Sequence, residues 1–81
     1  MKTITLAIRH GEPGWIKVEN INLGVSTHSY PESIRPGINY TMEQVRDLIL
    51  ADLRAQGAGA RVCRQNDRIL ISYEVKDSEI N

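Results

Sequence analysis

The sequence lacks several features that mark particular classes of protein. It has one cysteine, Cys63, so an internal disulfide and a multi-thiolate metal site are both excluded. No apolar run approaches the roughly 18 residues that a membrane-spanning helix needs. The first residues lead into an alternating segment instead of a signal-peptide core. We therefore expect a cytoplasmic protein that makes no membrane contact.

An excess of charge of one sign is also lacking, because ten basic residues balance ten acidic ones. The molecule as a whole therefore has no strong field that would attract nucleic acid or anionic lipid from a distance. Hydrophobic residues make up 41% of the chain, which is ordinary globular usage, and a length of 81 residues allows one core. The sequence predicts a single compact α+β domain over residues 1–81, with a frayed tail at residues 76–81.

Alternating hydrophobic residues predict a first strand over residues 3–9. Ile4, Leu6 and Ile8 recur there with a period of two, which is typical of a strand with one buried face. Residues 10–14 follow with two glycines and one proline, and these residue types favour chain reversal. The first strand is therefore expected to enter a hairpin.

The second predicted strand begins near Trp15, but its apolar period changes phase near Glu19 and Asn20. Either a β-bulge switches the inward face, or the strand ends and a short extra strand begins, because a shift of one residue reverses every later side chain. Of these two interpretations we favour the bulge. Residues 26–40 then show no sustained period and contain two prolines and a glycine, which predicts a long loop.

A capping box predicts a helix over residues 41–56, because Thr41 is followed three residues later by Gln44. Apolar residues then recur at spacings of three and four, which gives a stripe wide enough to cover a sheet. The stripe consists of Met42, Val45, Ile49 and Leu53, with Leu48 and Leu50 beside it. Tyr40 and Val45 take the two positions of a hydrophobic staple, and Gly57 suits the left-handed position that ends a helix.

The last third of the chain predicts a second hairpin, in which residues 61–65 and 68–75 flank a two-residue turn at Asn66 and Asp67. If Gln65 faces Arg68, paired residues share a face and the core side of the hairpin follows by counting. That side contains Ala60, Val62, Ile69, Ile71, Tyr73 and Val75.

The predicted fold class is therefore α+β, with a small antiparallel sheet, one amphipathic helix packed on one face, and the order β-β-α-β-β. This order resembles the β-grasp fold of ubiquitin-like proteins, in which an N-terminal hairpin is followed by a helix that lies across the sheet. Such a resemblance in fold implies no function by itself.

Residues that could carry catalysis form no motif in this sequence. Cys63 has neither His10 nor His28 at a spacing that demands a nucleophile and base pair. The histidines also lack metal-ligand spacing, and no glycine-rich phosphate loop leads from a strand into the helix. We therefore predict that the protein is not an enzyme and takes neither a metal ion nor a cofactor.

The candidate partner-binding residues are Trp15, His28, Tyr30 and Arg35, because Trp, Tyr and Arg dominate interface hot spots and three of the four lie in the predicted loop. Trp15 has a competing interpretation as a residue that closes one end of the core, since a core without Phe needs bulk. The sequence favours a small non-enzymatic protein-interaction module, either an inhibitor or an adaptor that acts on a larger protein partner. In general character it resembles the accessory proteins of phages and mobile elements. Homodimerisation through edge strands is a special case of this class.

The alternative function is nucleic-acid binding or nucleic-acid mimicry. Arg61, Arg64 and Arg68 lie on one predicted hairpin, and guanidinium groups bind phosphates in two-pronged fashion. The three arginines are split between the two faces, however, and no aromatic residue lies among them to stack on bases. This split, together with the zero net charge, ranks nucleic acid behind a protein partner.

Overall fold

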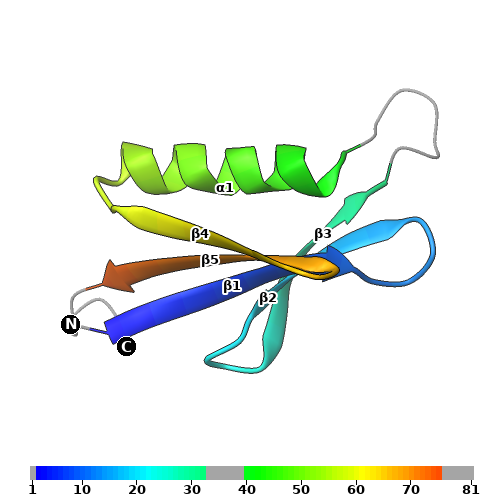
Figure 1. Cartoon of the computed structure of the whole chain (residues 1–81), viewed down its shortest axis with the longest axis horizontal. Helices are drawn as coiled ribbons and strands as arrows, with labels where there is room; N and C mark the ends of the chain where they lie inside the picture. Colours follow the sequence, from blue (N-terminus) through cyan, green and yellow to red (C-terminus); the bar gives the residue numbers. More distant parts are fainter. Residues whose placement is uncertain (1, 33–39, 76–81) are drawn as a thin grey trace.

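The computed structural model describes residues 2–32 and 40–75, which form one antiparallel sheet and one helix (Figure 1). In chain order the elements are β1 (Lys2–His10), β2 (Trp15–Asn20), β3 (Val25–Pro31), α1 (Met42–Ala55), β4 (Ala60–Gln65) and β5 (Arg68–Val75). The predicted α+β class, with the helix packed on one face of the sheet, is confirmed. The two predicted hairpins flank the helix as expected, and one further strand, β3, precedes it.

The strands lie side by side in the order β3-β2-β1-β5-β4, so the first strand of the chain is the centre of the sheet. β1 pairs with β2 through the N-terminal hairpin and with β5 on its other side, and both pairings are antiparallel. The register predicted for the second hairpin is confirmed from Gln65 opposite Arg68 to Ala60 opposite Tyr73. Asn66 has a positive φ of 24° in the turn between these strands.

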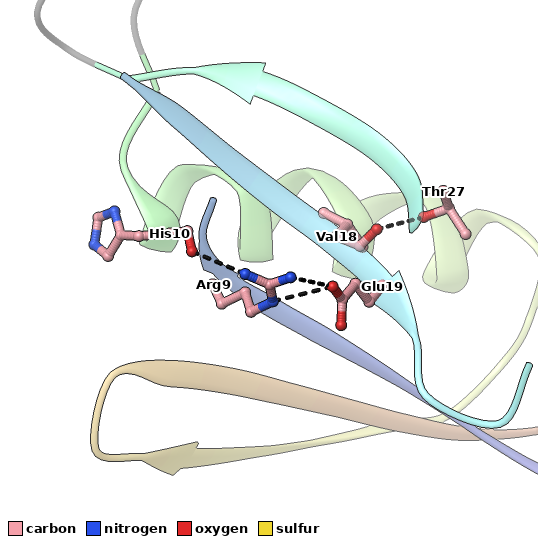
Figure 2. A network of polar contacts seen from close by, with 5 residues as sticks. All are labelled: Arg9, His10, Val18, Glu19 and Thr27. Carbon is pink, nitrogen blue, oxygen red and sulfur yellow. Dashed lines mark hydrogen bonds and ion pairs between the residues drawn. The ribbon is translucent and has the colours of Figure 1, made fainter. Parts of the chain in front are cut away.

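Strand β3 corrects the interpretation of the middle of the chain. β2 ends at Asn20, and a turn at residues 21–24 leads into β3, so the preferred bulge within one continuous strand is wrong and the extra strand is right. A bulge does exist, but it lies in β3: Val18 pairs with His28 and Glu19 with Ser26, which leaves Thr27 as the extra residue. The Thr27 hydroxyl donates to the Val18 carbonyl at 3.2 Å (Figure 2).

The long loop predicted over residues 26–40 is therefore wrong at its start, because residues 26–31 belong to β3. Residues 33–39, like the tail predicted at 76–81, lie outside the described residues. The strand inserted before the helix also makes the likeness to the order of elements in the β-grasp fold incomplete.

Both ends of α1 form as the sequence predicts. The Thr41 hydroxyl accepts from the Gln44 amide at 3.1 Å, and the Gln44 side chain accepts from the Thr41 amide at 2.9 Å, which completes the capping box. At the other end, Gly57 has φ 78° and its amide donates to the Arg54 carbonyl, while the Ala58 amide donates to the Leu53 carbonyl. These two bonds are those of a Schellman motif. No helix in the described part of the chain is long and apolar enough to cross a membrane.

The core lies between α1 and the side of the sheet that faces it. Its fully buried side chains come from the helix and from three neighbouring strands: Ile8, Ile16, Val45, Ile69 and Ile71. Met42 and Leu53 complete the buried stripe of α1, whereas Leu48 is 48% exposed. The prediction that Val62 belongs to the core is wrong, because this residue remains 45% exposed. Val62 does lie on the helix side of the sheet, as predicted. However, β4 is the edge of the sheet, and no strand lies beyond it in the described residues.

Candidate functional site

Within the described residues, no other element packs on one side of the sheet. Side chains alternate between the two sides along each strand, so residues in phase with Ile8 and Ile71 face the helix and the residues between them face away. α1 packs on one side only, and Figure 1 shows no second layer across the sheet from it in the described residues. We call the side away from α1 the open face. It consists of Thr3, Thr5, Ala7, Arg9, Trp15, Lys17, Glu19, Ser26, Ser29, Pro31, Arg61, Cys63, Gln65, Arg68, Leu70, Ser72 and Glu74.

Three cations form a row across the open face. The strand register pairs Arg9 of β1 with Lys17 of β2 on one side and with Arg68 of β5 on the other. Neighbouring strands are about 4.8 Å apart, so the three backbone positions lie within about 10 Å. Like charges directly opposite one another destabilise an antiparallel pair of strands. The row contains two such pairs, Arg9 with Lys17 and Arg9 with Arg68. This cation row (Lys17, Arg9 and Arg68) is therefore an arrangement that a bound anion would stabilise.

Glu19 is a carboxylate beside the cation row, and Figure 2 shows its hydrogen bonds to Arg9. Its Oε1 accepts hydrogen bonds from Nη2 of Arg9 and from Nε of Arg9, the latter at 3.1 Å, while Arg9 Nη1 donates to the His10 carbonyl at 3.1 Å. These hydrogen bonds and the charge of Arg9 lower the pKa of Glu19, and Lys17 and Arg68 add to the effect. The same pair raises the pKa of Arg9. Asp67 also acts on Arg9 through its charge, but Glu19 is the carboxylate that is hydrogen-bonded to the row.

The Arg9–Glu19 pair is accessible from solvent, because the two side chains are 38% and 31% exposed. An anion arriving at the open face can therefore compete with Glu19 for the Arg9 guanidinium. A guanidinium that is already held in place loses little freedom when it binds a second carboxylate or a phosphate. The pair positions one cation of the row while leaving it open to a ligand.

Trp15 lies on the open face beside the cation row. It precedes Lys17 by two residues in β2, so the two side chains share a face, and both line a shallow cavity with Glu12 and Ser29. The ring is half-buried. The sequence has no aromatic residue among the arginines of the last hairpin, whereas the fold places Trp15 on the same face as Arg9 and Arg68.

The four predicted partner-binding residues do not form one surface. His28 pairs with Val18 and Tyr30 with Ile16, so both lie on the helix side of the sheet, opposite to Trp15. On that side the rings of His28 and Tyr30 are stacked with centroids 6.1 Å apart, and Tyr30 meets Tyr40 edge-on at 5.3 Å. Arg35 lies outside the described residues.

The three arginines of the alternative site lie on two different faces of the sheet, as the alternation of side chains along a strand predicts. Arg61 and Arg68 lie on the open face, whereas Arg64 lies on the helix side, where its Nη1 donates to Glu43 of α1 at 2.9 Å. That hydrogen bond lowers the pKa of Glu43. The fold adds Arg9 and Lys17, which lie 59 and 51 residues before Arg68 in the sequence and outside the predicted second hairpin. Both residues alternate with the inward-facing residues of the first hairpin, and this period-two pattern would have placed them on its exposed face.

Cys63 is exposed on the open face, and His10 is engaged elsewhere, with its Nδ1 2.9 Å from the Glu32 carboxylate. Within residues 2–32 and 40–75, no three His, Cys, Asp or Glu side chains gather in a group that could hold a metal ion. Comparison with protein-family models, curated proteins and solved structures gave no match. The fold and the open face together define a small α+β protein with one uncovered, cation-bearing sheet surface.

Proposed function

We propose that this protein is a non-enzymatic protein-interaction module whose open face binds an acidic segment of a larger protein. The observation that carries the proposal is the cation row, in which Arg9 lies opposite Lys17 and Arg68 and is hydrogen-bonded to Glu19. An acidic segment would supply the missing negative charge. The role of such a module is that of an adaptor or an inhibitor of its partner.

The neighbours of the cation row favour a protein partner. The next row across the open face contains Leu70, which lies between buried Ala7 and exposed Cys63, so a small apolar pair lies beside the charges. Trp15 lies on the other side of the row. A mixture of Trp, Arg and small apolar residues is typical of the contact centre of protein interfaces, whereas a phosphate-binding surface is more uniformly basic.

The test measures binding of a fluorescein-labelled poly-glutamate peptide by fluorescence anisotropy at low salt. The variant Lys17→Gln/Arg68→Gln removes two cations and leaves the Arg9–Glu19 pair in place. We expect its affinity to fall by roughly tenfold, which corresponds to about 1.4 kcal/mol from two partly exposed charge contacts. Wild-type binding should also weaken as salt is added, because exposed charges are screened.

The matched control is Arg46→Gln/Arg54→Gln, which removes the same charge from α1, away from the open face. We expect this variant to bind the peptide as the wild type does. Equal losses in the two double variants would mean that net charge alone drives binding, and the open face would then be the wrong surface. Absence of wild-type binding at low salt would overturn the proposal altogether.

Binding of single-stranded nucleic acid is a second candidate function, and the position of Trp15 favours it. Single-strand binders combine a cationic track with an aromatic ring on which a base stacks, and Trp15 lies on the same face as the cation row. The same anisotropy assay with a labelled oligothymidylate separates the two candidates. Tighter binding of the oligonucleotide, with a steep loss on adding salt and a further loss in Trp15→Ala, would support nucleic acid over an acidic protein.

A further inference from the structure

The two edges of the sheet differ in how well they could accept another strand. β3 has a register shift at Thr27 and ends at Pro31, and bulges and prolines are the devices by which proteins block edge pairing. β4 keeps an unbroken register with β5 along all of Ala60–Gln65 and contains neither Pro nor Lys. Every residue of β4 after Ala60 is exposed. Of the two edges, only β3 thus has a bulge and a proline against pairing, whereas β4 has the charges of Arg61 and Arg64.

We propose that two copies of this chain associate through antiparallel pairing of β4 with the β4 of a second copy, centred on Val62. The result is one continuous sheet that joins the five strands of each copy. The pairing covers the edge of the sheet and the exposed Val62 side chain, which is 45% exposed in one copy.

The alternation of backbone hydrogen bonds along β4 is consistent with pairing centred on Val62. Gln65 and Arg68 flank a two-residue turn and pair through hydrogen bonds, so alternate residues from Gln65 bond to β5. The residues between them, Ala60, Val62 and Arg64, direct their N–H and C=O groups to the outer edge. A two-fold axis at Val62 aligns these groups with the same groups of the second copy.

The side chains of β4 also complement themselves in this register. Val62 meets the partner's Val62, and Arg64 meets the partner's Ala60, whose small side chain leaves room for it. Arg61 meets the partner's Cys63 on the open face. No arginine lies opposite another arginine, and Arg64 keeps its hydrogen bond to Glu43.

The helices leave space for the pairing. α1 contacts β1, β5 and β4, so its axis is centred near β5. The two copies of β5 are separated by three strand spacings, roughly 14 Å, whereas packed helices need about 8–10 Å. The inference is independent of the acidic-ligand proposal, because the outer edge of β4 is a different surface from the cation row.

The first test measures molecular mass against protein concentration by sedimentation equilibrium. The wild type should approach twice the 9.1 kDa of one chain as concentration rises. Val62→Lys places two like charges directly opposite each other at the two-fold axis, and we expect it to raise the dimer dissociation constant by roughly tenfold or more. Val25→Lys is the matched control on the edge strand β3, where Val25 is 49% exposed, and it should dimerise as the wild type does.

The second test uses disulfide trapping and does not depend on the fold of Val62→Lys. In the proposed register, Arg61 and the partner's Cys63 form a pair with Cα atoms about 4.5 Å apart, within the range of a disulfide. Arg61→Cys should therefore give a covalent dimer rapidly on mild oxidation, whereas Arg54→Cys on the helix should not. A wild type that stays monomeric, an effect confined to Val25→Lys, or equal trapping in both cysteine variants would each overturn the inference.

Discussion

At the scale of single residues, Glu19 links the stability of the fold to the charge of the open face. It is held by Arg9 and lies near Lys17 and Arg68, so its carboxylate relieves the repulsion within the cation row. Removing that carboxylate should weaken the fold and at the same time expose three cations to an outside ligand. Removal of Glu19 should thus lower the stability of the fold but raise its affinity for an anion, so the two roles of Glu19 can be measured separately.

Glu19→Gln is therefore expected to lower the free energy of unfolding at neutral pH by up to about 1 kcal/mol, the upper range for a partly exposed ion pair. The pKa of Glu19 is lowered by folding, so its contribution is complete above the unfolded pKa and is lost as the pH falls through the lowered pKa. The difference between variant and wild type should accordingly vanish in acid. Urea denaturation at neutral pH and at a pH below the lowered pKa of Glu19 measures both free energies.

The same substitution should strengthen binding of the poly-glutamate peptide, because it frees Arg9 for the ligand. Glu43→Gln is the control: it removes a carboxylate paired with Arg64 on the helix side and leaves the open face unchanged. If Glu19→Gln binds the peptide no better than Glu43→Gln does, the Arg9 guanidinium is not part of the binding surface.

Sequence parity would have identified the members of the cation row, but only the strand order reveals the row itself. Arg9 and Lys17 alternate with buried Ile8 and Val18, so their outward direction follows from the period-two pattern. Their alignment with Arg68 depends on β5 pairing with β1, a contact between opposite ends of the chain. Periodicity describes one strand at a time and carries no information about which strands are neighbours.

At the scale of elements, local signals were reliable where they were strong. The capping box of α1 and the register of the last hairpin are both confirmed, because each depends on residues a few positions apart. β3 was missed because only Tyr30 near its end packs against the core, and the preceding residues are exposed on both sides. An edge strand without a buried face has no alternating pattern to read, and the bulge at Thr27 interrupts what pattern remains.

The end of α1 provides a stability prediction at this scale. Gly57 has φ 78°, and a side chain there would meet no atom within 4 Å, so any cost of Gly57→Ala comes from the backbone alone. We expect a loss of about 1 kcal/mol in the free energy of unfolding, the usual cost of a left-handed conformation for an L-residue. Gly59→Ala is the control, because it also meets open space without a left-handed φ, and it should be neutral or slightly stabilising. Equal effects in thermal or urea denaturation would contradict the assigned role of Gly57.

At the scale of the whole molecule, the β4 pairing and the cation row combine into a bivalent surface. A two-fold axis perpendicular to the joined sheet keeps both open faces on the same side, so the two cation rows would face the same ligand. A long acidic chain can then bind both rows at once, and the second contact gains from a high effective concentration. A short acidic peptide can reach only one row.

We therefore expect wild-type protein to bind a poly-glutamate chain of about 20 residues at least tenfold more tightly than a peptide of about four residues, after correction for the number of sites. Val62→Lys should lose most of this advantage while binding the short peptide as the wild type does, because its own cation row is intact. Lys17→Gln/Arg68→Gln should weaken binding of both peptides and leave the dimer unchanged in sedimentation. If Val62→Lys retained the full preference for the long chain, the two rows would not act together, since avidity requires both open faces in one particle.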